Sequence, residues 1–295
     1  MLQVTVLGSG SRGNAFLIDG TESSLLVDAG FGTRTLARRL ATAGRRPEQL
    51  SSVLLTHEHT DHSCGAVAAC ERWGWTLRGG AATIEAVRAE ALAKRDVVDE
   101  PEASESDATR TRALRSAALP AEGRTRFDGW TVEAVMVPHD ARECMAFVLT
   151  DESSGERVGI ALDLGHVPKA LPATFSGLDL LVVESNHDEK LLANGPYPWM
   201  LKRRIGGELG HLGNGAASAF IASCAHRGLR GVLLAHLSQT NNTPEHALSR
   251  TREALRRAGW RRDALYAAHQ VTPYGPLSLD GRSRYEGATQ LALGL

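Results

Sequence analysis

The fold is decided by the stretch Thr56-His57-Glu58-His59-Thr60-Asp61-His62, which contains an HxHxDH motif. The apolar segment Val53–Thr56 predicts a short buried strand that ends at the first histidine, so the motif lies in a loop where side chains can converge on one point. Two imidazoles at positions i and i+2 can hold one cation, while the carboxylate and imidazole at i+4 and i+5 can hold a second. Neutral imidazole with carboxylate suits zinc, and also manganese or iron. The motif therefore predicts a site for two divalent metal ions, with zinc as the first candidate.

Three more candidate ligands complete a set of seven, and each lies at the C-terminal end of an expected strand, as the motif does. The strands are expected at Trp130–Val137, Val158–Asp163 and Gly231–Ala235, and the ligands at their ends are His139, Asp163 and His236. Taken alone, a histidine in such a place is more often a surface residue than a ligand. The HxHxDH motif upstream favours the metal interpretation for all three.

Short apolar strands alternate with amphipathic helices along the whole chain. Besides those above, strands are expected at Gln3–Leu7, Ala15–Asp19, Leu25–Asp28, Ala146–Thr150, Leu178–Glu184 and Leu265–Thr272. Helices are expected at Thr33–Ala43, Ser63–Arg72, Ala81–Lys94, Pro198–Ile205, Gly215–Arg227 and Pro244–Ala258. This order favours a single α/β domain over residues 1–295, built as a four-layer αββα sandwich with two sheets face to face and helices outside.

One stretch, at about 96–126, differs in composition from the rest. Residues 96–107 carry six acidic side chains and no basic one, and residues 110–126 carry five arginines and one glutamate. Such charge blocks are typical of a solvated loop or a mobile insertion. An acidic–basic hairpin that associates with itself is the alternative.

Composition and charge limit the classes of function. Hydrophobic residues make up 42% and charged residues 23% of the chain, which is ordinary for a globular protein. The net charge of −1 gives no overall basic field, so an anionic substrate has to be held by a local site. No apolar run approaches the roughly 20 residues of a membrane span, and the first residues, MLQVTVLG, lack a signal pattern. Four scattered cysteines indicate free thiols in a reducing compartment, so we expect a cytoplasmic protein without membrane contact.

The ligand order resembles that of the metallo-β-lactamase superfamily, and the resemblance covers nearly the whole chain. It consists of Asp28 after a strand, the HxHxDH motif, and then a lone His, a lone Asp and a lone His. The resemblance implies one metal held by His57, His59 and His139, a second held by Asp61, His62 and His236, and Asp163 as the bridge between them. It also implies that Asp28 fixes the HxHxDH loop through hydrogen bonds. An aspartate bridge is shared by nucleases, glyoxalases and lactonases but is absent from true β-lactamases, so antibiotic hydrolysis is not expected.

A finer resemblance is to the WalJ (YycJ) branch of bacterial metal-dependent phosphodiesterases and exonucleases. The segments that carry it are Gly8-Ser9-Gly10-Ser11-Arg12-Gly13-Asn14, His139-Asp140-Ala141, Glu184-Ser185-Asn186-His187-Asp188, Gly195-Pro196-Tyr197-Pro198 with Leu201-Lys202-Arg203-Arg204-Ile205, Gly210-His211-Leu212-Gly213-Asn214, and His236-Leu237-Ser238 with Asn241-Asn242. Two departures are Arg142-Glu143-Cys144, where an Asp-Pro-like pair is expected, and the charged stretch at 96–126. Either can alter access of the substrate without touching the metals.

Several residues are candidates for binding the substrate. His211 precedes a helix for which Asn214 is the expected N-cap, and a helix start favours an anion. Lys202, Arg203 and Arg204 form a basic run that is either a solvated helix face or a contact to phosphates. Beside these, Ser11 and Asn14 lie in a loop that is either a tight turn or a wall of the active site, and His187 is a further candidate for a phosphate contact.

These observations predict a dinuclear metal-dependent hydrolase, with a metal-bridging hydroxide attacking phosphorus in line. Asp61 and Asp163 would orient the hydroxide, and His211 or His187 would contact the phosphate or assist the leaving group. A phosphodiesterase or 5′-to-3′ DNA exonuclease, with nucleic acid as the partner, is the first hypothesis. The alternatives are a thioesterase or lactonase on the same metals, similar to glyoxalase II, and a metal-stabilised binding module without turnover. The sequence carries no signal for an oligomeric state.

Overall fold

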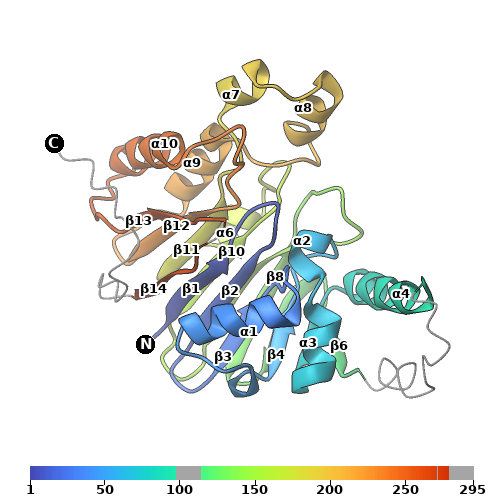
Figure 1. The fold of residues 1–295 in the computed structure, drawn as a ribbon. Helices are drawn as coiled ribbons and strands as arrows, with labels where there is room; N and C mark the ends of the chain where they lie inside the picture. Colours follow the sequence, from blue (N-terminus) through green and yellow to red (C-terminus); the bar gives the residue numbers. More distant parts are fainter. Residues whose placement is uncertain (98–113, 271, 279–295) are drawn as a thin grey trace.

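Two seven-stranded sheets form the centre of the computed structural model, which describes residues 1–97, 114–270 and 272–278 (Figure 1). The first sheet has the order β14-β1-β2-β3-β4-β5-β6. Its strands are β1 (Gln3–Gly8), β2 (Ala15–Asp19), β3 (Ser24–Val27), β4 (Ser52–Leu54), β5 (Thr76–Gly79), β6 (Ser116–Ala118) and β14 (Tyr274–Ser278). From β14 to β3 the neighbours are antiparallel, and from β3 to β6 they are parallel.

The second sheet repeats this mixed pattern, with the order β13-β12-β11-β10-β9-β8-β7. Its strands are β7 (Glu122–Phe127), β8 (Trp130–Met136), β9 (Met145–Asp151), β10 (Arg157–Ala161), β11 (Leu180–Glu184), β12 (Gly231–Ala235) and β13 (Leu265–Ala267). From β7 to β10 the neighbours are antiparallel, and from β10 to β13 they are parallel. Parallel neighbours run in the same direction, so their C-terminal ends meet at one edge of each sheet.

Helices cover the outer face of each sheet. The first sheet is covered by α1 (Thr33–Thr42), α3 (Ala66–Trp73) and α4 (Ala81–Val97), and the second by α6 (Leu171–Thr174), α9 (Asn214–Ser223) and α10 (Pro244–Arg257) (Figure 1). The remaining helices are short: η1 (Pro47–Gln49), α2 (Thr60–Ser63), α7 (Glu189–Asn194) and α8 (Trp199–Ile205). The last two project together at the top of the view.

The alternation of side chains along the strands explains the layers. In β2, Phe16 and Ile18 point into the core between the two sheets, while Leu17 between them points to the helices α1 and α3. In β11, Val182 faces the inner core and Val183 faces the outer helices. Because both faces of the central strands are buried, they are nearly continuous apolar runs. The predicted four-layer αββα sandwich is confirmed.

Some local expectations were wrong. The strands β5 and β14 were not expected, and the helix expected over Ser63–Arg72 is divided into α2 and α3. In the charged stretch at 96–126, residues 114–126 include β6 and part of β7 instead of only loop, while residues 98–113 lie outside the described residues. Residue Asn214 begins α9 and is not its N-cap, because its side chain bonds Ser185 and Asn242 instead. Within the described ranges, no helix is both long enough and apolar enough to cross a membrane.

Candidate metal centre

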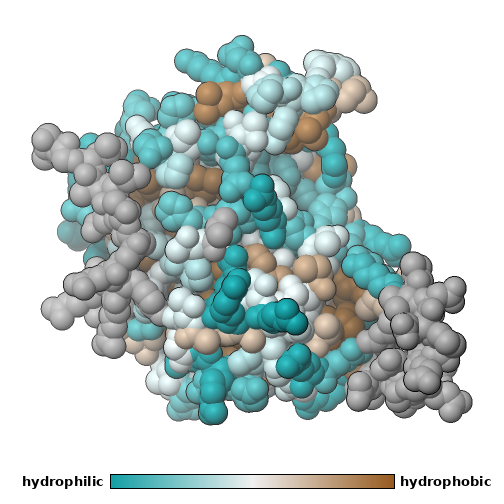
Figure 2. Space-filling view, in the orientation of Figure 1, coloured by the Kyte–Doolittle hydropathy of each residue, from teal (hydrophilic) through white to brown (hydrophobic). Residues whose placement is uncertain are grey.

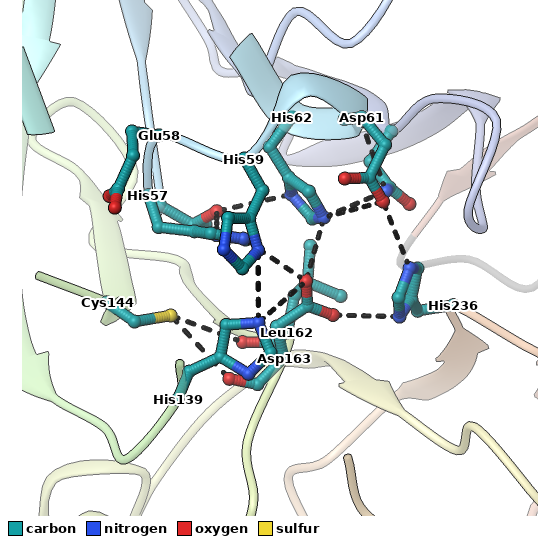
Figure 3. A network of polar contacts seen from close by, with 12 residues as sticks. His57, Glu58, His59, Asp61, His62, His139, Cys144, Leu162, Asp163 and His236 are labelled. Carbon is teal, nitrogen blue, oxygen red and sulfur yellow. Dashed lines mark hydrogen bonds and ion pairs between the residues drawn. The ribbon is translucent and has the colours of Figure 1, made fainter. Parts of the chain in front are cut away.

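All seven predicted ligands converge on one point beyond the ends of the strands, with Asp163 in the middle (Figure 3). Asp163 Oδ2 lies 3.4 Å from His57 Nε2 and 2.9 Å from His62 Nε2, and Asp163 Oδ1 lies 2.8 Å from His236 Nδ1. Its carboxylate therefore faces ligands from both sheets. Asp163 lies two residues beyond the C-terminal end of β10, whereas the sequence predicted it as the last residue of the strand.

The ligands form two groups, each with donor atoms within 4.8 Å of one another. The first group is His57, His59, His139 and Asp163, and the second is Asp61, His62 and His236. These groups coincide with the two metal sites that the resemblance implied. Asp163 belongs to the first group, but its Oδ2 also lies close to His62 Nε2 of the second group. A carboxylate that bridges two metal ions has to lie between the two sets of ligands in this way.

Each of the five histidines has one ring nitrogen held by an outer partner, while the other faces the cluster. The outer partners are Thr56 Oγ1 for His57, the carbonyl of Asp140 for His59, Asp28 for His62, the carbonyl of Gly210 for His139 and Glu184 for His236. Metal-binding histidines in proteins show this arrangement, because the outer hydrogen bond fixes the ring and its tautomer. The ring orientations are therefore already set for ligation.

Asp28 forms hydrogen bonds with the HxHxDH loop. It is fully buried, and its carboxylate accepts hydrogen bonds from the Thr56 backbone N–H at 2.8 Å and from His62 Nδ1 at 2.7 Å. The loop of Asp28 also contacts the HxHxDH turn through its backbone, since Ala29 N–H donates to the carbonyl of His62 at 2.7 Å. At Gly30 an added Cβ would lie 1.8 Å from the Asp61 carbonyl, so only glycine allows this approach.

Three of the site residues have a left-handed backbone conformation. Asp28, Asp163 and His236 have φ angles of 61°, 54° and 52°. This conformation is uncommon for residues other than glycine and tends to occur where function requires it. At each position it turns the chain sharply after a strand, so the side chain points into the cluster. Asp128, in the turn between β7 and β8, has the same conformation at 52° but lies outside the cluster.

Buried carboxylates control the charge of the histidines. Burial alone lowers the pKa of His62, but Asp163 and Asp28 outweigh burial and raise that pKa to about 10. The pKa of His57 lies well below its ordinary value, because burial dominates and His62 adds repulsion. In Asp163, neighbouring His236 and His62 outweigh burial and hold the carboxyl pKa well below its usual range. Positive charge is thus stabilised around an ionised Asp163.

The arrangement fits divalent cations. Within the described residues, His57 Nε2 and His236 Nε2 are buried and have no hydrogen-bond partner. Buried polar atoms are normally satisfied, so two such atoms in a cluster of imidazoles and carboxylates indicate a missing partner. Imidazole and carboxylate are the ligand types that zinc, manganese and iron accept.

Glu184 is a site residue that we did not predict. It is fully buried at the C-terminal end of β11, and its Oε1 accepts from His211 Nδ1 at 2.6 Å and from His236 Nδ1 at 3.0 Å. Its Oε2 accepts from the backbone N–H groups of Leu164 and Leu212. A polar residue at the end of an apolar strand was the signal that identified Asp163, and the same signal applies to Glu184.

Cys144 lies beneath Asp163 but does not offer a ligand. Its Sγ is 3.6 Å from the carbonyl oxygen of Asp163, to which the thiol donates (Figure 3). Burial raises its pKa well above the ordinary value, so the thiol stays protonated. The unexpected residues just before it have structural contacts: Arg142 N–H donates to Glu58 Oε1, and Glu143 Oε2 accepts from the Ala82 N–H at the start of α4.

A pocket opens over the metal ligands. Its walls include Ser11, Asp140, Leu201, Arg204, Ile205 and His211, besides ligands from both groups. The predicted residues Ser11 and His211 thus reach the pocket. Arg204, the last residue of the predicted basic run, is the one Lys or Arg side chain in the pocket wall among the described residues, and it pairs with Asp140 at 2.7 Å.

The other predicted substrate contacts lie elsewhere. Asn14 is fully buried, and its side chain bonds Gly10 and lies 2.9 Å from His62 Nε2. His187 is 4% exposed and is absent from the pocket wall. Lys202 bonds the carbonyl of Ala193, and Arg203 lies over the Trp199 ring, so neither faces the pocket.

Comparison with known proteins agrees with this geometry. The family model described as the β-lactamase superfamily domain matches residues 24–237. The chain therefore belongs to the metallo-β-lactamase superfamily. The match begins at β3 and ends just after His236, so it includes Asp28 and all seven candidate ligands.

The relatives place the chain within the WalJ (YycJ) branch, as predicted. Exodeoxyribonuclease WalJ of Streptococcus pneumoniae is 31% identical over 246 residues, which cover 82% of this chain and 84% of the relative. Exodeoxyribonuclease YycJ of Bacillus anthracis is 28% identical over 278 residues, which cover 94% and 98%. In fold, the chain is similar to the metallo-β-lactamase fold protein YhfI from Bacillus subtilis, with a TM-score of 0.63, 17% identity, and 92% and 98% of the two chains covered.

Proposed function

We propose that this chain is a dinuclear metal-dependent hydrolase of phosphodiester bonds that acts on DNA as a 5′-to-3′ exonuclease. The observation that carries the proposal is the convergence of seven ligand side chains from four loops around Asp163. The names of the relatives support the reaction class, because both are called exodeoxyribonucleases and match most of this chain. Two zinc ions are the first candidates, with manganese or iron as alternatives.

The proposed ligand sets follow the two groups of side chains. His57, His59 and His139 would hold one cation, Asp61, His62 and His236 the other, and Asp163 both. Bound divalent cations would polarise the phosphodiester and make water a stronger nucleophile near neutral pH. Asp61, whose side chain is 25% exposed, and Asp163 line the pocket, and their carboxylates can orient an attacking water.

His211 is the proposed proton donor to the leaving oxygen. Its Nδ1 donates to Glu184, and the ring lines the pocket. Burial lowers the pKa of His211, but Glu184 and Asp163 outweigh burial and raise it to about 9. The two carboxylates therefore favour the protonated ring, which can release a proton as the bond to the leaving oxygen breaks.

Substrate contacts are proposed for the accessible residues only. Ser11 and His211 line the pocket, and Lys202 and Arg203 offer positive charge beside it. Burial of Asn14 and His187 argues against direct contact with substrate. For Asn14 we propose a positioning role, because its amide lies between the Gly10 turn and His62.

The experiment is metal analysis followed by digestion assays. Purified protein is assayed for bound metals and then incubated with bis-p-nitrophenyl phosphate and with end-labelled single-stranded and duplex DNA carrying 5′-phosphate or 5′-hydroxyl. We expect two metals per chain and release of nucleotides from the 5′ end. Metal-replete protein that leaves every phosphodiester intact but cleaves thioesters or lactones would overturn the proposal in favour of the alternative function.

The setting of the enzyme is part of the same proposal. We propose a cytoplasmic enzyme with a single domain over residues 1–295, whose catalysis does not require residues 98–113. Deletion of residues 98–113 and their replacement by a short Gly-Ser linker tests this, with the hydrolysis of bis-p-nitrophenyl phosphate as the measurement. We expect unchanged hydrolysis, because all seven candidate ligands lie outside the deleted segment.

A further inference from the structure

The helix α8 buries none of its residues, although it contains large apolar side chains. Trp199 is 65% exposed and Met200 is 70% exposed. Figure 2 shows apolar surface among hydrophilic residues at the top of the molecule, where α7 and α8 project. Large apolar residues are usually buried, and exposed groups of them mark binding surfaces.

The two faces of α8 have different surroundings. Leu201, Arg204 and Ile205, at positions i, i+3 and i+4, share one face and line the metal pocket. Trp199 and Arg203, also four residues apart, share the opposite face, where the guanidinium lies 5.4 Å from the centre of the indole ring. A single short helix therefore separates the metal pocket from an exposed aromatic side chain.

The charge of α8 is complementary to a nucleic acid. The sequence WMLKRRI contains three cations and no acidic residue. Arg204 pairs with Asp140, whereas Lys202 and Arg203 form no ion pair with any residue in the described part of the chain. Two of the three charges are thus available to phosphates.

We propose that Trp199, Met200 and Arg203, named here the α8 platform, bind an unpaired base and its phosphate in a DNA strand whose end lies in the metal pocket. This inference rests on the proposed function. Stacking of bases on an aromatic ring beside cations is the usual means of binding single strands without sequence preference. A two-fold contact with a second copy is disfavoured, because it would place Lys202 and Arg203 against the same cations of the other copy.

The position of the platform defines which part of the strand it binds. A helix with its side chains is about 10–12 Å across, so the platform lies on the far side of the pocket wall, a few nucleotides from the scissile bond. The platform binds long substrates and leaves the hydrolysis of small phosphodiesters unchanged. It therefore favours substrates with a single-stranded end over compact ones.

The test compares Trp199→Ala with Trp199→Phe and Arg203→Ala in the full chain. Binding of a fluorescent 15-nucleotide oligothymidylate to metal-free protein is measured by anisotropy at low salt, and metal-loaded protein is assayed on bis-p-nitrophenyl phosphate and on the oligonucleotide. We expect Trp199→Ala to weaken oligonucleotide binding about tenfold, as the loss of one stacked base does. Trp199→Phe keeps an aromatic face, so most of the affinity should remain.

Matched controls are Leu92→Ala and Arg126→Ala, which remove an exposed apolar side chain and an exposed cation elsewhere. Both should bind the oligonucleotide and hydrolyse bis-p-nitrophenyl phosphate as the unchanged protein does, whereas Trp199→Ala should lose more activity on the oligonucleotide than on bis-p-nitrophenyl phosphate. A crosslink from 5-iodo-deoxyuridine placed a few nucleotides from the 5′ end to Trp199 would support the proposal directly.

Three outcomes would overturn this proposal. The first is that Trp199→Ala binds the oligonucleotide as tightly as the unchanged protein, and the second is that the unchanged protein does not bind it. The third is that Trp199→Ala changes the sedimentation of the protein, which would show α8 to be an interface between copies. The proposed function can fail independently of the platform. If neither the unchanged protein nor any variant hydrolyses a phosphodiester, but Trp199→Ala still weakens oligonucleotide binding, the proposed nuclease activity is wrong and the proposed DNA-binding platform is supported.

Discussion

The base of the pocket and its side wall are held in place by different interactions. The base, called the floor here, consists of the seven candidate ligands, and the wall is the helix α8. In the floor, His57, His62 and Asp163 are almost completely buried, and every histidine has an outer hydrogen-bond partner. In the wall, α8 has no buried residue and is fastened by the exposed pair of Arg204 with Asp140 and by Lys202 on the Ala193 carbonyl. Buried rings that have an outer hydrogen-bond partner are held in place, whereas exposed ion pairs contribute little to stability.

The difference between the buried floor and the exposed wall corresponds to two tasks, catalysis at the metal site and binding of the DNA strand. Chemistry requires ligand positions held to a fraction of an ångström, which the floor supplies through its outer partners. Recognition of a flexible strand requires accessible side chains, which α8 supplies. Substitutions in the floor should therefore change metal content and turnover, while substitutions in the wall should change affinity for long substrates and leave small ones unaffected.

The largest effect is expected from Asp163→Ala. Asp163 lies between the two groups of ligands, so its loss should remove metal and lower turnover on bis-p-nitrophenyl phosphate by at least about a thousandfold. Asp128→Ala is the matched control, since Asp128 has the same left-handed backbone but lies outside the cluster. Normal turnover and two metals per chain in Asp163→Ala would contradict the assignment.

A smaller loss is expected from Asp28→Asn, which leaves every ligand in place. An amide cannot accept from both the Thr56 N–H and His62 Nδ1 as the carboxylate does. Metal affinity should fall about 10–100-fold, the usual cost of removing an outer partner. Asp151→Asn serves as the control, because Asp151 is a buried carboxylate that holds the Thr21 turn instead. Equal metal affinity in the two variants would show that the floor tolerates such a change.

The floor should also make stability depend on pH in opposite ways with and without metal. In metal-free protein the pKa of His62 is raised from 6.5 to about 10, so the stability it contributes is complete below about pH 6.5 and lost as pH rises toward 10. Cations replace these protons and bind more tightly as pH rises. The difference in melting temperature between metal-loaded and metal-free protein should therefore widen from pH 6.5 to 9. If the melting temperatures of the two forms run parallel from pH 6.5 to 9, metal binding is not coupled to the loss of these protons.

The smallest effect is expected from Lys202→Ala in the wall. Loss of one phosphate contact should weaken binding of single-stranded DNA a few-fold and reduce the slope of log affinity against log salt by about 0.7. Arg124→Ala, an exposed arginine of β7, is the control. An unchanged slope would show that Lys202 serves only to join α7 and α8.

The sequence predicted which side chains come together in the floor, because each candidate ligand is marked by a local signal. A polar residue at the end of an apolar strand identified His139, Asp163 and His236, and the parallel strands bring these ends together. Glu184 carries the same signal but was not singled out, because a single glutamate at a strand end indicates nothing until its neighbours are known.

The wall was predicted less well, for a reason of geometry. The run Lys202-Arg203-Arg204 shows three cations, but which of them faces the pocket depends on the rotation of α8 against the rest of the fold. Short edge elements were also difficult. The strand β7, EGRTRF, is largely exposed and charged, as edge strands often are, so its composition is that of a loop.

The spread of the ligands along the chain has a consequence for biosynthesis. His57, Asp61 and His62 leave the ribosome long before His236, which follows the twelfth strand. Until that last imidazole and Asp163 are in place, the early histidines form an incomplete chelator without the partners that orient it. If two metal ions bind as proposed, they can be loaded only after most of the polypeptide has been translated, so metal binding is a late step of maturation.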